Sequence, residues 1–431
     1  MKSSERYAWY VVGVLMLANI SYWVDRQILS LLVVPIQRDL GITRTQMSYL
    51  GAIPFAVFST LLALPIARVA DRRSRRGVIV AGSALWSVMT ALCGLAGTYG
   101  RLLVARIGVG VGESSLQPAA TSLLADLFPV DRVSTAMSVF NTAVFIGSGL
   151  AYIIGGWIVG LVSTQEQWIL PVIGAVHPWQ TVFFAVGLPG LLITLLLVTV
   201  REPDRSQQAR AARVPLRALL SYVRSHARTF GCLAFGYGFS STVNIGIAFW
   251  LATFLIEKHG WPPSRAGEVQ GALTITIGTL GVYAGGRMAD WFVRRGRIDG
   301  PLRVGIIGAS GMLVSATAYP LASSATAAIV WLAIVNFFAA FPWGAASTAA
   351  AEAVPTSMRA QGTSLYFLVV NLLSVGLGPP AVAVVADRLF HDKTAVANAL
   401  AVVNVVGMTA AIILLSLGMP AYRRTVTTRD A

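Results

Sequence analysis

The hydrophobic positions of this chain form long, nearly continuous runs that short polar segments separate. A run of about 20 apolar residues is long enough for a helix to cross the roughly 30 Å hydrocarbon core of a bilayer. The pattern predicts an all-α membrane protein with twelve transmembrane helices. The predicted spans are 8–33, 46–69, 77–98, 101–126, 134–162, 180–200, 229–256, 264–289, 302–323, 325–351, 360–386 and 395–418.

Composition agrees with this pattern. Only 12% of the 431 residues are charged and 55% are hydrophobic, whereas about a quarter of the residues of a soluble domain are charged. The net charge of +15 is concentrated on one side of the predicted spans, the side that holds both termini. This positive-inside pattern places both termini in the cytoplasm and the chain in the inner (plasma) membrane. The basic residues therefore indicate topology and contact with anionic lipid, and no nucleic-acid partner is expected.

One long polar, Arg-rich segment separates the first six predicted spans from the last six. We expect an N-terminal six-helix bundle at 1–200, a basic cytoplasmic linker at 201–228, and a C-terminal six-helix bundle with a cytoplasmic tail at 229–431. The two halves also repeat in sequence, since "ALPIARVADRRSRRG" corresponds to "GVYAGGRMADWFVRRG". Two pseudo-symmetric bundles around a central cavity are typical of secondary transporters.

The loop that follows the second predicted span resembles the Asp-Arg-x-Gly-Arg-Arg motif of the major facilitator superfamily. Ser74 stands in place of the middle glycine, and Ala67 in place of the glycine that opens the motif. Within that superfamily, the segments "SYWVDRQ", "RIGVGVGESS", "ADLFPVDR", "GSGLAYIIGG" and "VREPDR" are similar to the spinster branch. The resemblance implies a bacterial spinster-like transporter, related to proteins that move sphingolipids and lysolipids by alternating access.

Four charged residues lie within predicted spans and away from the membrane surfaces. They are Asp25, Arg26, Arg106 and Glu113. A charge at the middle of a bilayer costs roughly 2.5 to 3.5 kcal/mol on insertion scales. The corresponding positions of the second repeat are uncharged, and Asn244 takes the place of Asp25. The fold therefore does not require these charges, which favours a functional role.

The spacing of these residues suggests how they meet. Neighbours on a helix point about 100° apart, so Asp25 and Arg26 each need a partner elsewhere. Arg106, Glu113 and Gln117 have helical spacing that places them on one polar stripe. We expect Asp25 and Glu113 to be protonation switches, with the two arginines as charge partners or anchors for an anionic group. The alternative is a buried ion-pair network that only holds the spans together.

Uncharged polar and aromatic residues within the spans are further candidates for substrate contact. Such a residue more often forms a hydrogen bond between helices than a contact with a ligand. These candidates are Tyr22, Gln117, Asn141, Asn244, Trp343 and Tyr366. The glycines of the fourth and fifth spans are expected to allow close helix contact, and the proline of "FPWG" at 341–344 to interrupt the tenth span.

Charges at the cytoplasmic ends of the second and eighth spans suggest a gate. A carboxylate there can approach a facing helix N-terminus in one state and leave it in another. The alternative is a basic loop that serves topology alone. The candidate gating residues are Asp71, Arg72, Arg75, Arg76, Asp290 and Arg294.

These observations favour a proton-coupled secondary transporter of a lipid-like amphipathic substrate, such as a lysophospholipid or a sphingoid compound. A transporter of a small organic or sugar acid, or a drug exporter, remains an alternative. The four histidines are scattered, the two cysteines lie far apart, and no P-loop motif occurs, so an enzyme, a metal site or another cofactor is not expected. We expect protons as the coupling ion, a monomer, and a bound substrate that is amphipathic or anionic.

Overall fold

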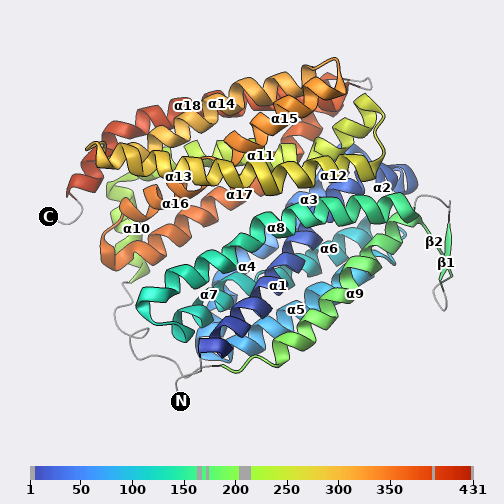
Figure 1. Cartoon of the computed structure of the whole chain (residues 1–431), viewed down its shortest axis with the longest axis horizontal. Helices are drawn as coiled ribbons and strands as arrows, with labels where there is room; N and C mark the ends of the chain where they lie inside the picture. Colours follow the sequence, from blue (N-terminus) through green and yellow to red (C-terminus); the bar gives the residue numbers. More distant parts are fainter. Residues whose placement is uncertain (1–4, 163–166, 171–173, 203–214, 391–393, 429–431) are drawn as a thin grey trace. The chain divides into compact units, whose positions relative to one another are not determined.

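The computed structural model describes residues 5–162, 167–170, 174–202, 215–390 and 394–428. Figure 1 labels the α-helices and strands and colours the chain from blue at the N-terminus to red at the C-terminus. The first half contains α1 (Glu5–Leu31), α2 (Val33–Leu40), α3 (Arg44–Ile53), η1 (Pro54–Ser59), α4 (Thr60–Arg72), α5 (Arg75–Cys93), α6 (Tyr99–Glu113), α7 (Leu116–Leu127), α8 (Val130–Val162), β1 (Trp168–Leu170), β2 (Gly174–Val176) and α9 (Pro178–Val198). The second half contains α10 (Leu216–Ser225), α11 (Ala227–His259), α12 (Pro263–Leu273), η3 (Thr274–Gly278), α13 (Thr279–Arg294), α14 (Gly300–Leu321), α15 (Ala325–Ala340), α16 (Trp343–Glu352), η4 (Thr356–Met358), α17 (Arg359–Leu389) and α18 (Ala395–Thr428).

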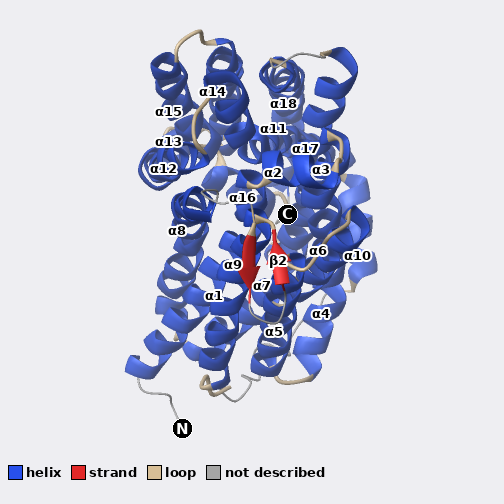
Figure 2. Ribbon diagram, turned by 90° about the vertical axis from the view of Figure 1, so that its right-hand side faces the viewer, coloured by secondary structure: helices blue, strands red, loops and turns tan. Residues whose placement is uncertain are grey.

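The described residues are almost entirely helical, as the hydrophobic runs predict. Ten helices or helix runs among them are long and apolar enough to cross a membrane. The predicted spans 101–126 and 264–289 do not meet that measure; they are divided among α6 and α7, and among α12, η3 and α13. The multi-pass helical architecture is confirmed, and the number of twelve spans stays a prediction. Sequence analysis missed the antiparallel hairpin of β1 and β2, whose strands are red in Figure 2.

The contacts divide the chain into two compact units. Unit 1 comprises residues 1–209 and 260–272, and unit 2 comprises residues 210–259 and 273–431. The helix α12 therefore groups with unit 1, although it lies in the second half of the chain. There it packs closely on α8: a Cβ atom added to Gly267 would lie 2.1 Å from the Tyr152 carbonyl oxygen. Of the predicted linker 201–228, residues 203–214 lie outside the described residues, and α10 begins at Leu216.

Small residues allow the helices of unit 1 to approach one another, as predicted. On α8, a Cβ at Gly147 would lie 2.9 Å from the Cβ of Trp23, and a Cβ at Gly155 would lie 2.3 Å from Ile28. These glycines bring α1 and α8 into close contact along much of their length. Side chains at these positions would push α1 away from α8, and the charged residues of α1 would move with it.

Proline positions explain several helix interruptions. The run α3, η1 and α4 contains a π-helical segment that begins at Pro54, because proline cannot donate the main-chain hydrogen bond of a regular helix. In unit 2, α15 ends before Pro342, which is the N-cap of α16. This break is the one predicted for "FPWG". Trp250 of α11 donates a hydrogen bond from Nε1 to the Pro379 carbonyl oxygen of α17 (2.9 Å), which joins these two helices.

Candidate transport site in unit 1

Three of the four predicted charges are fully enclosed in unit 1. Asp25 of α1 and Arg106 of α6 are 0% exposed, and Glu113 at the end of α6 is 1% exposed. Arg26 is only partly buried. The charge of Glu113 interacts electrostatically with those of Arg26, Asp25 and Arg106. The four residues therefore form one cluster, which we call the α1–α6 charge cluster.

The arginines of this cluster do not hydrogen bond to its carboxylates. Arg106 donates from Nη1 to the main-chain carbonyl oxygen of Asp25 at 3.3 Å, and Arg26 donates from Nη1 to the hydroxyl of Tyr22 at 2.9 Å. Within the described part of the chain, no arginine hydrogen bonds to a carboxylate oxygen of Asp25 or Glu113, and the buried hydroxyl of Thr90 lies beside the Asp25 carboxylate. The expected partners thus lie nearby, and no ion pair joins either arginine to either carboxylate among the described residues. The functional role and the purely structural alternative both stay predictions.

Phe55 is a central residue of the cluster that sequence analysis missed. The Cζ atoms of Arg26 and Arg106 lie 5.0 and 4.8 Å from the centroid of its ring. Arg26 also lies 5.5 Å from the ring centroid of Trp23. A guanidinium over an aromatic face gains about 0.5 to 2 kcal/mol or more, depending on desolvation. Phe55 therefore helps to hold both arginines in place.

Phe55 reaches this position because η1 and α6 touch through their backbones. A Cβ added to Gly110 would lie 2.2 Å from the carbonyl oxygen of Pro54. Only glycine allows such an approach. The signals in the sequence are a glycine one helical turn after Arg106 and a Pro-Phe pair in the second predicted span. Neither shows which two helices meet, so Phe55 could not be assigned from them.

Further buried polar atoms on α5 accompany the cluster. Trp86 Nε1 and Ser87 Oγ have no hydrogen-bond partner among the described residues, and both side chains are fully buried. The helices α5 and α6 meet at Gly112, where a Cβ would lie 2.7 Å from the Trp86 amide nitrogen. The interior of unit 1 thus contains buried donors and acceptors that the described residues do not satisfy.

The predicted polar stripe from Arg106 to Gln117 is wrong beyond Glu113. The helix ends there, Ser114 and Ser115 interrupt it, and Gln117 belongs to α7. Pro118 accounts for the restart, because proline is tolerated in the first turn of a helix but not in its interior. Gln117 donates instead to Asn19 Oδ1 of α1 at 3.1 Å, and Asn19 is a buried residue that sequence analysis missed.

The remaining substrate candidates belong to both units. Asn141 lies on α8 of unit 1 and is exposed. Asn244 of α11, Trp343 of α16 and Tyr366 of α17 belong to unit 2. Trp343 is 51% exposed, whereas Tyr366 is buried against Tyr237, with ring centroids 6.5 Å apart. A role in substrate contact stays a prediction for all four residues.

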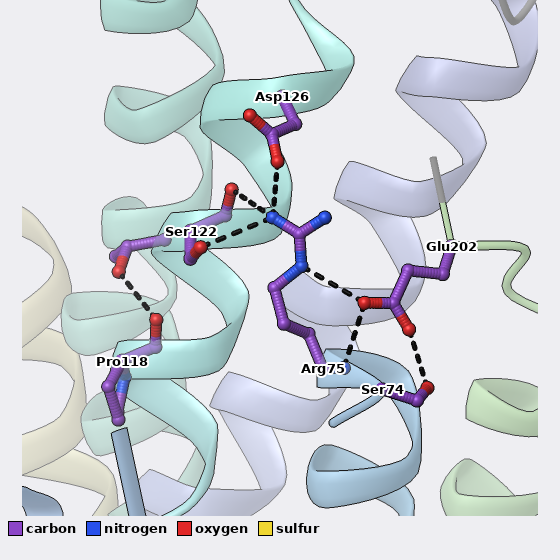
Figure 3. A network of polar contacts seen from close by, with 7 residues as sticks. Ser74, Arg75, Pro118, Ser122, Asp126 and Glu202 are labelled. Atoms are coloured by element: carbon purple, nitrogen blue, oxygen red, sulfur yellow. Dashed lines mark hydrogen bonds and ion pairs between the residues drawn. The ribbon is translucent and has the colours of Figure 1, made fainter. Parts of the chain in front are cut away.

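Of the predicted gating residues, Arg75 is the one most firmly held. Figure 3 shows its side chain between Asp126 and Ser122 on one side and Glu202 on the other. The Nη1 atom lies 2.5 Å from Asp126 Oδ2, and the Nε atom lies 3.1 Å from Glu202 Oε1. Ser74 also donates to Glu202. Burial raises the pKa of Glu202, but hydrogen bonds from Ser74 and Arg75 and the Arg75 charge outweigh it, so the pKa is lowered.

The other predicted gating residues are less engaged. Arg76 donates from Nη1 to the Val200 carbonyl oxygen at 3.2 Å. Asp290 and Arg294 are exposed at the end of α13 in unit 2. The side chains of Asp71 and Arg72 lie outside the described residues.

Unit 2 has its own charged junction, at Asp299. This residue precedes α14 and is 1% exposed. Its Oδ2 atom lies 3.0 Å from Arg303 Nε and 2.7 Å from Arg423 Nη2 of α18. Burial raises the pKa of Asp299, but the Arg423 hydrogen bond and the two arginine charges outweigh this effect and lower it. Sequence analysis gave no signal for this junction.

Long apolar helices with charges buried between them are the architecture of a membrane transporter. The family comparison makes this specific. The model of the Major Facilitator Superfamily matches residues 15–379, and the chain belongs to this family. Membership confirms the prediction of a transporter that is not an enzyme and needs no cofactor.

Curated relatives within the family include an "MFS-type efflux pump" of Mycolicibacterium smegmatis, which is 27% identical over 91% of this chain and 87% of that protein. Human "Protein spinster homolog 1" is 26% identical over 88% of this chain and 73% of that protein. Drosophila "Protein spinster" is 26% identical over 73% of this chain, which spans about half of that protein (51%).

Solved structures agree. The crystal structure of a bacterial homologue of the human lysosomal transporter spinster, in an inward-facing and unoccupied conformation, has a TM-score of 0.81, 26% identity, and coverage of 99% of this chain and 98% of the other. A D-xylose–proton symporter has a TM-score of 0.74 at 15% identity, over 95% of this chain and 97% of that one, and shares the fold. The prediction of a spinster-like transporter is thereby confirmed.

Proposed function

We propose that this chain is a proton-coupled transporter that works by alternating access on a lipid-like amphipathic substrate, of the lysophospholipid or sphingoid type. The observation that carries the proposal is the α1–α6 charge cluster. Its carboxylates, Asp25 and Glu113, are enclosed and accept no hydrogen bond from an arginine among the described residues, while Arg106 is held by a main-chain carbonyl. Buried charges of this kind are costly, and in membrane proteins they mark ion or proton pathways.

The proposed mechanism assigns separate roles to the two kinds of charge. Arginine keeps its proton, so Arg26 and Arg106 are fixed charges. A carboxylate can bind and release a proton, and doing so changes its attraction to those arginines. Protonation of Asp25 or Glu113 would thus favour one state of the transporter over the other. The arginines would hold the anionic part of a substrate, with Tyr22 positioning Arg26.

The lipid-like substrate rests on the spinster relatives, and efflux of other amphipathic compounds is the second candidate. The latter is favoured by the relative from Mycolicibacterium smegmatis that is named an efflux pump. Asn141, Asn244, Gln117, Trp343 and Tyr366 are proposed as weaker substrate contacts. Gating is proposed for Asp71, Arg72, Arg75, Arg76, Asp290 and Arg294.

The finer architecture is also a proposal. We place twelve spans in two six-helix bundles, at 1–200 and 229–431, joined by the linker 201–228. The chain is a monomer in the inner membrane with both termini in the cytoplasm, as the positive-inside distribution favours.

The test is proton-driven uptake into liposomes that contain the purified protein. A lysophospholipid, a cationic dye and a sugar acid are compared under an imposed proton gradient. The double variant Asp25→Asn, Glu113→Gln is expected to abolish gradient-driven uptake of the true substrate, and Glu268→Gln, an exposed carboxylate of α12, is the matched control. Unchanged uptake of every compound in a folded double variant would refute the proton switch, and uptake of the dye or the sugar acid alone would refute the lipid-like substrate.

A further inference from the structure

A pocket of about 240 Å³ lies in unit 2, where α11 begins and α18 ends. Arg228 lines it from the start of α11, His226 from the residue between α10 and α11, and Arg424 from the last turns of α18. The hydroxyls of Thr229 and Thr425 hydrogen bond to each other at 2.9 Å and form part of its wall. The pocket thus contains two permanent positive charges, and no carboxylate is among its lining residues.

Among the described residues, the two arginines of this pocket have no carboxylate partner. Arg228 donates from Nη2 to the Leu417 carbonyl oxygen at 3.5 Å, which is a weak contact. Neither Arg228 nor Arg424 forms an ion pair within the part of the chain that the structure describes. The neighbouring Arg423 behaves differently, because it binds the carboxylate of Asp299 at 2.7 Å. The positive charge of the pocket is therefore available to an anion from outside the protein.

An exposed apolar stripe continues from the pocket along both helices. On α18, Leu417 and Ile413 are each 52% exposed. Leu417 lies seven residues before Arg424 and Ile413 four residues before Leu417, so all three are on one face of the helix. On α11, Phe235 is 45% exposed and lies seven residues after Arg228. From Arg424 to Ile413 the helix rises about 16 Å, roughly half of the hydrocarbon thickness. A cationic end followed by an apolar stripe of this length has the dimensions of a phospholipid in one leaflet of the bilayer.

We propose that this pocket binds the phosphate group of an anionic phospholipid, whose acyl chains lie along the apolar stripe of α11 and α18. Guanidinium groups bind phosphate through charge-assisted hydrogen bonds, and basic pockets between membrane helices recognise anionic headgroups. A free phosphate ion would use the arginines but not the stripe. The site lies entirely within unit 2, and the lipid bound there is a permanent neighbour that joins α11 to α18, distinct from any transported substrate.

The test measures lipid binding to the purified full-length protein in a neutral detergent, by native mass spectrometry. The probes are phosphatidylglycerol, phosphatidylcholine and inorganic phosphate. The variant Arg228→Ala, Arg424→Ala is expected to lose about thirtyfold in affinity for phosphatidylglycerol, because each arginine near the surface contributes about a fivefold factor. The charge-matched control is Arg287→Ala, Arg297→Ala, which removes two exposed arginines elsewhere in unit 2 and is expected to bind as the parent does.

Several outcomes would overturn the proposal. One is parent-like binding of phosphatidylglycerol by the folded Arg228→Ala, Arg424→Ala variant. Others are equal binding of phosphatidylcholine, or competition by inorganic phosphate at the same concentration as the lipid. If the double variant does not fold, the single variant Arg424→Gln, with an expected loss of about fivefold, decides the matter. Binding must also persist in the Asp25→Asn, Glu113→Gln variant, since its loss there would place the lipid in the transport site instead.

Discussion

The contact between η1 and α6 gives the sharpest test of how the charge cluster is built. Gly110→Ala would place a methyl group 2.2 Å from the carbonyl oxygen of Pro54, well inside van der Waals contact. The obstacle is backbone, so it cannot move aside as the end of a flexible side chain would. Either η1 or α6 must shift, and Phe55 and its two arginines must shift with it.

The magnitude follows from two opposing effects. Alanine in place of a helical glycine stabilises the helix by about 1 kcal/mol, and overpacking typically costs about 1 to 3 kcal/mol. A contact of 2.2 Å with main-chain oxygen belongs at the upper end of that range. We therefore expect Gly110→Ala to be destabilised by about 1 to 2 kcal/mol net.

The matched control is Gly100→Ala, the same change in the first turn of the same helix. A Cβ at Gly100 would meet no atom within 4 Å, so this variant is expected to be neutral or slightly more stable. Thermal unfolding in detergent compares the two proteins, and each kcal/mol corresponds to about 2 to 4 °C for a domain of roughly 200 residues. If Gly110→Ala melts at or above the temperature of Gly100→Ala, the close contact does not fix the position of η1.

The other contacts make further predictions. Asp299→Asn is expected to lower stability at neutral pH by about 1 to 3 kcal/mol, since the two arginines that it leaves are partly solvated. The folded-state pKa of Asp299 is lowered, so its contribution to the free energy of unfolding is fully present above the ordinary carboxyl pKa of about 4 and is lost as the pH falls below it. Between pH 6 and pH 3, the melting temperature of the variant should therefore fall less than that of the parent. Arg75→Lys keeps the charge but cannot bridge two carboxylates, and should melt several degrees below both the parent and the exposed-site control Arg101→Lys. Phe55→Leu should free the arginines to approach the carboxylates. A carboxylate bonded to arginine takes up a proton only in more acidic solution, so the pH profile of uptake should shift to lower pH. The control is Phe58→Leu, and equal pH profiles for the two variants would contradict this reasoning.

Hydrophobicity predicts much of this fold because the bilayer imposes it. Ten of the predicted spans coincide with helix runs that are apolar enough to cross a membrane. The span 101–126 was harder because it is divided at Ser114 and Ser115, and the span 264–289 was harder because it is rich in glycine and threonine. The break at Ser114 and Ser115 depends on local main-chain hydrogen bonding, to which a measure of apolar content does not respond.

The candidate site shows a similar limit. Asp25, Arg26, Arg106 and Glu113 could be selected because charge within a span is rare and costly. Their actual partners could not, because a partner depends on the rotation of each helix and on the depth at which two helices cross. Phe55 is an ordinary apolar residue of its span, and it acquires a role only when Gly110 brings η1 against α6.

The arrangement of the arginines bears on why the cluster exists. If stability alone mattered, Arg106 would be expected to bond to a carboxylate, since leaving a buried charge without a partner is among the costliest defects in a protein. Instead it contacts the Phe55 ring and the Asp25 carbonyl oxygen, and Arg26 contacts Tyr22 and the same ring. Both guanidinium groups are held close to the carboxylates without being bonded to them. Under the proposed mechanism, a proton or an anionic substrate would shift the balance between bonded and unbonded arrangements of these charges, which is what coupling requires.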